Sequence, residues 1–142
     1  MDKVAAFFEA YETRFNQSLK GEVDVDGTMA AFADSFTEAS PAGVISGNND
    51  ETFKETIPKG YEFYRSIGTQ SMRIMALDIT WLNDIHVMVK VCWQAIYQKK
   101  DGNKETINFD VYYFLQERNG TLKIFAYITG DEQAVLKERG LI

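Results

Sequence analysis

The feature that most constrains this chain is the dipeptide Asn119-Gly120, which separates two runs of alternating apolar side chains. A two-residue type I′ turn needs positive φ at both central positions, and Asn-Gly is a pair that adopts it readily. The sequence therefore predicts a β-hairpin over residues 104–130. Once this turn is fixed, Arg118 pairs with Thr121, and every further pair follows by counting away from the turn.

Counting from this turn gives the two faces of the hairpin different characters. The expected pairs on the aliphatic face are Leu115 with Ile124, Tyr113 with Ala126, and Val111 with Ile128. The expected pairs on the aromatic face are Phe114 with Phe125, Tyr112 with Tyr127, and Asp110 with Thr129. The aromatic face therefore carries a single carboxylate, and we expect this face to look toward the helices.

Two further long strands are predicted before the hairpin, over residues 71–83 and 86–98, with turns at Asn83-Asp84 and Asp101-Gly102. If each of these turns contains two residues, Trp93 lies opposite Asp110 on the aromatic face. A three-residue turn or a bulge would exchange the faces of one strand.

The first half of the chain has mainly helical spacing. Apolar side chains predict an amphipathic helix over residues 4–19, and a short second helix capped by Asp26 or Thr28 and reaching Phe36. A short strand at residues 44–45 and a helical stretch from residue 49 or 50 to 66 follow, with a break expected at Pro58. Asp131 is expected to cap a short helix near the end. This order of elements predicts an α+β domain.

Composition excludes several classes of function. The chain has 142 residues and a net charge of −6, which argues against nucleic acid and anionic membrane surfaces as partners. No apolar run approaches the length of a membrane span, and the first residues lack a signal-peptide pattern. Cys92 is the only cysteine, and no metal-ligand spacing or cofactor motif is present. We therefore expect a cytoplasmic protein without a metal or cofactor.

Both faces of the predicted sheet are apolar, whereas a solvated face would show polar alternation. The helices can cover only one face, and a large exposed apolar surface is unusual for a monomer. We therefore expect a homodimer that packs through the uncovered face. The alternative is that the C-terminal helix and a curled sheet cover it.

The element order, the segment Ser40-Pro41-Ala42-Gly43 and the final pattern of two hairpins with Asp-Gly and Asn-Gly turns resemble the nuclear-transport-factor-2-like superfamily. This group is also called SnoaL-like or ketosteroid-isomerase-like. The resemblance covers residues 1–142 as one domain. It implies a cone-shaped, strongly bent antiparallel sheet packed on N-terminal helices, as in cystatin-like folds. It implies little about function, because the fold hosts isomerases, dehydratases, cyclases, hydrolases and non-catalytic binders.

Ketosteroid isomerases of this group use a general-base Asp, and a Tyr and a protonated Asp that donate hydrogen bonds to the oxyanion. The resemblance places the base at Ser40, the tyrosine near Phe15 and the oxyanion Asp at Asp110 or Tyr112. The base and one donor are therefore absent, and a serine hydroxyl cannot accept a proton near neutral pH without a partner base. This departure argues against isomerase chemistry of that type.

Asp110 is the candidate catalytic residue, because a carboxylate on an aromatic inward face would have a raised pKa suited to acid/base work. The candidate ligand-pocket residues are Trp93, Tyr112, Phe114, Phe125, Tyr127, Phe15 and Tyr64. The sequence favours a pocket for an apolar or aromatic small molecule, with weak isomerase-like or lyase-like chemistry at Asp110 as a further expectation. A second interpretation stays open, in which a dimeric, non-catalytic module for protein association has its cone filled by its own side chains. A cavity of about 300 Å³ or more would favour the first.

Overall fold

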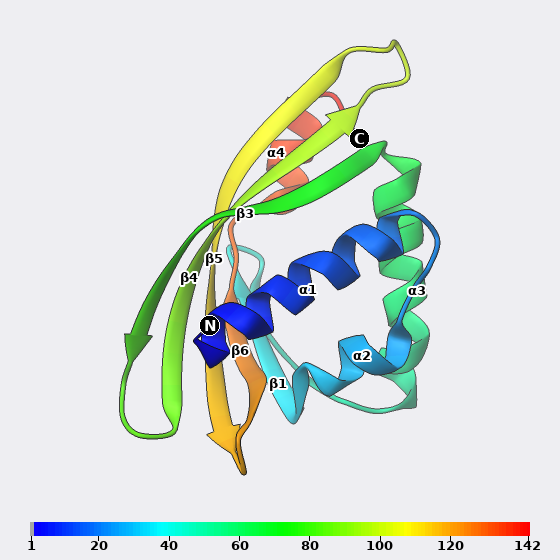
Figure 1. Cartoon of the computed structure of the whole chain (residues 1–142). Helices are drawn as coiled ribbons and strands as arrows, with labels where there is room; N and C mark the ends of the chain where they lie inside the picture. The colour runs from blue at the N-terminus through cyan, green and yellow to red at the C-terminus, as the bar shows by residue number, and fades with distance from the viewer. Residues whose placement is uncertain (1) are drawn as a thin grey trace.

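The computed structural model describes residues 2–142 and confirms the α+β fold (Figure 1). The described elements are α1 (Lys3–Leu19), α2 (Val25–Ala30), β1 (Phe32–Ser40), β2 (Gly43–Asn48), α3 (Glu51–Ser66), β3 (Thr69–Trp81), β4 (His86–Gln98), β5 (Lys104–Arg118), β6 (Thr121–Ile128) and α4 (Glu132–Glu138). Within these residues, six strands form one sheet in the order β2-β1-β6-β5-β4-β3. Strands β1 and β6 run parallel, and the other neighbouring strands are antiparallel.

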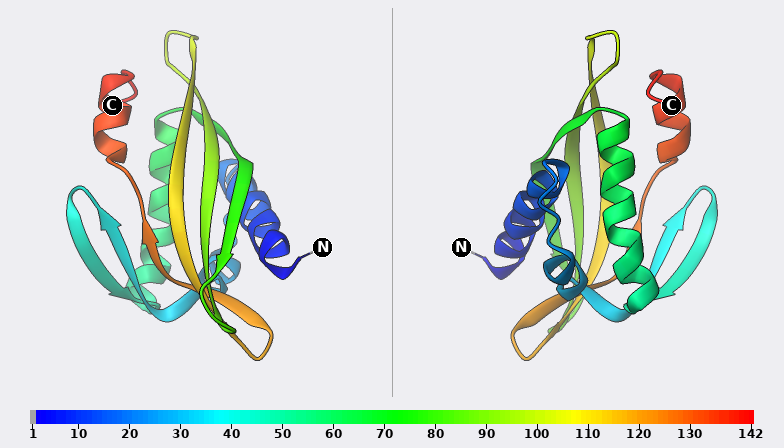
Figure 2. Two further views of the ribbon diagram at one scale, coloured as in Figure 1. Left: turned by 90° about the vertical axis from the view of Figure 1, so that its left-hand side faces the viewer. Right: turned by 90° about the vertical axis from the view of Figure 1, so that its right-hand side faces the viewer.

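The helices cover one face of the sheet, which we call the inner face. Figure 2 shows α1, α3 and α4 side by side on this face, with α3 between the other two. The opposite, outer face carries no helix of the described part of the chain (Figures 1 and 2). None of the helices in residues 2–142 has the length and apolar character needed to cross a membrane.

The Asn119-Gly120 hairpin forms as predicted near its turn. Asn119 has φ 51° and Gly120 has φ 78°, and Arg118 pairs with Thr121. A bulge then shifts the register beyond Leu115, so that the more distant predicted pairs are wrong. The observed pairs beyond the bulge are Phe114 with Ala126, Tyr113 with Tyr127, and Tyr112 with Ile128.

The turn between β4 and β5 is one residue longer than predicted. The last strand pair joins Gln98 to Lys104, and the amide N–H of Lys99 donates to the Asn103 carbonyl at 2.8 Å. Three residues, 100–102, therefore make the turn. The loop between β3 and β4 is also longer, because the amide of Leu82 donates to the His86 carbonyl at 2.8 Å. Each added residue changes which side chains of neighbouring strands share a face.

Two predictions for the first half of the chain are wrong. Phe32 and Phe36 lie in β1, because a spacing of four residues also places side chains on one face of a strand. There they pack against Phe53 of α3, with ring centroids 5.5 and 4.8 Å away. The other error is at Pro58, which lies inside the continuous helix α3. Pro58 is exposed, so water can bind the carbonyl that proline leaves without its helical partner.

Helix α1 is attached to the free edge of the sheet through side chains. Asn16 donates to the Met72 carbonyl at 2.7 Å and accepts from the Met72 amide at 2.9 Å. One turn earlier, the Glu12 carboxylate accepts a hydrogen bond from the amide of Ile74. Because β3 is an edge strand, these bonds satisfy backbone groups that would otherwise be free to pair with another chain.

Replacing Asn16 with alanine should lower the free energy of unfolding by about 1–3 kcal/mol, because both polar groups of the buried Met72 lose their partner. Urea denaturation measures this change. The control is Gln17→Ala, one position along α1, whose exposed side chain should matter by less than about 0.5 kcal/mol. Equal losses in the two variants would contradict the role given to Asn16.

Candidate functional site

A cavity of about 450 Å³ lies between the inner face of the sheet, the helices and the β1–β2 hairpin. Nine of the 22 residues that line it are aromatic, and they come from α1, α3 and four strands. These are Tyr11, Phe15, Phe32, Tyr64, Trp93, Tyr97, Phe109, Tyr113 and Tyr127. At one end the wall becomes polar, where residues of β1 and of the segment that enters α4 meet.

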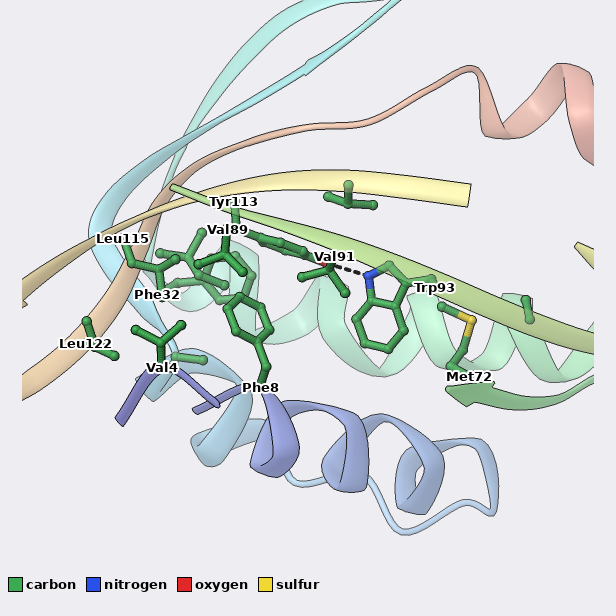
Figure 3. Packing of buried hydrophobic residues seen from close by; sticks show 14 of the residues in the cluster. Val4, Phe8, Phe32, Met72, Val89, Val91, Trp93, Tyr113, Leu115 and Leu122 are labelled. Atoms are coloured by element: carbon green, nitrogen blue, oxygen red, sulfur yellow. Dashed lines mark hydrogen bonds between the residues drawn. The ribbon is translucent and has the colours of Figure 1, made fainter. Parts of the chain in front are cut away.

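The pairing of β4 with β5 determines which side chains reach the cavity. Trp93 lies opposite Phe109, and the inner row continues through Val111 and Tyr113. The Trp93 indole N–H donates to the Tyr113 hydroxyl at 3.2 Å inside the core (Figure 3). Burial raises the pKa of Tyr113 above its ordinary value of 10.0. This residue is therefore a neutral member of the wall.

Asp110 does not reach the cavity, and its predicted inward orientation is wrong. It lies opposite Cys92 on the outer face, with one carboxylate oxygen 3.8 Å from the Lys90 ammonium, and it is about half exposed. The physical cause is the three-residue turn at 100–102, which moves β5 by one position against β4 and so reverses its faces. Without an apolar pocket around it, Asp110 lacks the environment on which its proposed acid/base role rested.

The other predicted pocket residues divide between the two faces. Trp93, Tyr127, Phe15 and Tyr64 lie in the cavity wall. Tyr112 and Phe114 share the outer face with Asp110, because they too are even-numbered residues of β5. Phe125 packs against Phe114, with ring centroids 6.3 Å apart, and the bulge next to it returns Tyr127 to the inner face.

Two glutamates that the sequence did not single out lie at the polar end of the cavity, and each accepts a hydrogen bond from a tyrosine of the wall. The Tyr127 hydroxyl donates to Glu38 at 3.2 Å, and the Tyr64 hydroxyl lies 3.1 and 3.0 Å from the two oxygens of Glu132. Glu38 and Tyr127 are register partners of the parallel pair β1 and β6. The pattern of residues around Glu38 predicts no strand, so the pairing of Glu38 with Tyr127 could not be predicted from the sequence.

Electrostatics at this end of the cavity raise the pKa of one carboxyl group. Desolvation raises the pKa of Glu132 above its ordinary value of 4.5, the negative charge of Glu38 raises it further, and the Tyr64 hydrogen bond opposes both. The neighbouring Asp131 accepts from the amide of Ala134 at 3.0 Å and so serves as the N-cap of α4. The two glutamates can accept hydrogen bonds and balance positive charge, and Glu132 can exchange a proton closer to neutrality than an ordinary carboxyl.

The position that the resemblance gave to a general base has no carboxylate. Ser40 lies at the rim of the cavity, where its hydroxyl oxygen accepts from the amide of Ala42 at 3.2 Å. Phe15, the position of the family's tyrosine donor, is a wall residue without a hydrogen-bonding group. Among residues 2–142, no three histidine, cysteine, aspartate or glutamate side chains gather closely enough to hold a metal ion.

The family model described as "NTF2-like protein (DUF6841)" matches residues 2–132. The chain belongs to this NTF2-like family. No curated protein matches the chain.

Solved structures with low sequence identity share the fold of this NTF2-like chain. An NTF2-like protein of unknown function from Shewanella oneidensis MR-1 is 17% identical, with a TM-score of 0.65 over 90% of this chain and 96% of that one. A protein of unknown function with a cystatin-like fold from Nostoc punctiforme is 18% identical, with a TM-score of 0.61 over 93% and 95%. Aln2 from a Streptomyces species is 17% identical, with a TM-score of 0.65 over 96% and 93%. These likenesses confirm the fold.

In this NTF2-like chain, replacing Tyr113 with phenylalanine should lower the free energy of unfolding by about 1–3 kcal/mol, because the buried Trp93 N–H loses its acceptor. Chemical denaturation monitored by circular dichroism measures the loss. Tyr112→Phe is the matched control, since the neighbouring hydroxyl lies on the exposed outer face, and it should change stability by less than about 0.5 kcal/mol. If Tyr113→Phe lowers the free energy of unfolding no more than Tyr112→Phe does, the buried hydrogen bond contributes nothing measurable.

Proposed function

We propose that this protein binds a small, ring-containing molecule in the aromatic cavity. The observation that supports the proposal is the volume of about 450 Å³, which falls within the ~300–1,000 Å³ of ordinary ligand pockets. The wall is mainly apolar and aromatic, and its polar side chains from β1 and from the segment that enters α4 are gathered at one end. Such a distribution suits a ligand with an apolar ring system and one polar end.

The alternative of a cone filled by its own side chains is less well supported. The side chains that would have filled it are turned away, since Tyr112, Phe114 and Phe125 all lie on the outer face. The inner row instead carries Val111 between Phe109 and Tyr113, and it leaves open volume beneath α1 and α3. The proposed activity is therefore ligand binding, without chemistry at Asp110.

Blocking the cavity should abolish binding of a neutral aromatic probe. Thr129 lies in the wall directly after β6, so Thr129→Trp should lower the affinity for 2-naphthylmethanol by about tenfold or more through loss of volume. Isothermal titration calorimetry measures the affinity. The control is Thr121→Trp at the opposite, exposed end of β6, which should bind like the natural chain. If the natural chain shows no saturable binding, or if both variants bind alike, the cavity is not the site.

We also propose that the outer face pairs two copies of the chain. Tyr112 and Ile128 are 36% and 44% exposed there, and no helix of the described residues covers them. A two-fold interface brings one patch against itself, and this face carries both signs of charge in Lys90 and Asp110. These exposed apolar side chains, beside charges of both signs, support a second copy of the chain as the partner.

A charge in the middle of this face should separate the two copies. Tyr112→Glu should raise the dimer dissociation constant by about tenfold or more, because it places a charge among apolar contacts. Sedimentation equilibrium measures the constant. Thr13→Glu, on the exposed side of α1, is the control and should leave the assembly unchanged. A natural chain that sediments as a monomer at all concentrations would overturn this proposal.

A further inference from the structure

The polar end of the cavity shows which class of ligand the pocket suits. We infer that the ligand is a protonated amine that carries an aromatic or other apolar ring, with its ammonium group between Glu38 and Glu132. This inference rests on the proposed binding function and goes beyond it, because an aromatic cavity alone would accept neutral or anionic rings equally well.

The two glutamates have no positively charged partner within the described part of the chain. Each accepts a hydrogen bond only from a neutral tyrosine hydroxyl, and neither takes part in an ion pair. The described residues that line the cavity include no lysine, arginine or histidine. Two carboxylates that share one partly desolvated site repel each other, so a cation that enters the site relieves an unfavourable interaction.

Lys137 of α4 is exposed and does not line the cavity, and two other positive side chains near the end of α4 pair with a carboxylate outside the cavity. The Arg139 guanidinium and the Lys99 ammonium lie 3.0 and 3.4 Å from the carboxylate of Glu105. These two cations lower the pKa of Glu105, so they stabilise the Glu105 carboxylate rather than a glutamate of the cavity. On β6, the ammonium of Lys123 donates to the backbone carbonyl of Ala30 at 2.9 Å. None of these groups lines the cavity.

A third polar group in the cavity wall is left for a ligand. Tyr97 is 4% exposed and lines the cavity, yet its hydroxyl takes part in none of the side-chain hydrogen bonds within residues 2–142. Burial and the nearby charge of Glu132 raise its pKa to about 12, so the hydroxyl is neutral and can accept or donate. The hydroxyl is not among the fully enclosed polar atoms of residues 2–142 that lack a partner, so it is accessible from the cavity, and an ammonium N–H can donate to it.

The rest of the wall suits an organic cation better than a metal ion. No group of three potential ligands within residues 2–142 could hold a metal, whereas Trp93 and several tyrosines surround the same space. Aromatic faces attract ammonium groups through their quadrupole, and most strongly when the site excludes water. The ring of the ligand would pack against the same aromatic side chains.

The test compares three probes with one ring system and different charges, at about pH 7, where a primary alkylamine is protonated. Calorimetric titration with 2-naphthylmethylamine, 2-naphthylmethanol and 2-naphthoate should give the tightest binding for the amine and the weakest for the carboxylate. Glu38→Gln and Glu132→Gln should each weaken amine binding by about tenfold, since an amide keeps the tyrosine contact but loses the charge. Both variants should weaken binding of the amine more than binding of the alcohol, and circular dichroism spectra that match the natural chain show that they are folded.

Two further variants complete the test. Glu138→Gln removes one negative charge from the exposed side of the same helix and should not change amine binding. Tyr97→Phe should weaken amine binding. An unchanged affinity would show that the Tyr97 hydroxyl does not contact the ligand. If the alcohol binds as tightly as the amine, the inference fails and the binding function stands. If none of the three probes binds, the binding function itself fails.

Discussion

The pairing of β4 with β5 is the constraint on which the remaining structure depends. It is the longest uninterrupted ladder in the sheet, and its register places one row of side chains, including Val91, Trp93 and Tyr113, toward the helices. Helix α1 packs on this row through Val4 and Phe8 (Figure 3). A shift of one residue would send Asp110 into the core and turn the cavity wall outward. Core, cavity and outer face are thus consequences of one set of backbone hydrogen bonds.

Local chemistry allowed much of this fold to be predicted from the sequence. The Asn119-Gly120 pair forms the expected two-residue turn, α1 has a regular apolar stripe, and Asp131 caps α4 as expected. The inward face of β5 could not be predicted, because both of its rows are apolar and only the length of the turn at 100–102 distinguishes them. The strand at Phe32 was missed for a related reason, since its apolar spacing fits a helix and a strand equally well.

Some residues of the candidate site could likewise be predicted from the sequence, and others could not. Trp93 and Tyr127 were expected in a pocket because they are aromatic residues on long strands, and they line the cavity on the inner face. Glu38 and Glu132 were not expected, since they are 94 positions apart and meet only because β1 adds to the sheet beside β6. No periodic pattern encodes such a meeting. A site built from the ends of distant elements becomes visible only when the tertiary structure places those ends together.

The chain contains two tryptophans, and they report on different parts of the molecule. Trp93 is 2% exposed in the cavity wall, whereas Trp81 is 41% exposed at the end of β3. An indole in an apolar wall emits at shorter wavelength than an indole in water. The intrinsic emission of the protein therefore has a component that senses the cavity and another that senses solvent. The fold thus carries its own optical probe for whatever enters the cone.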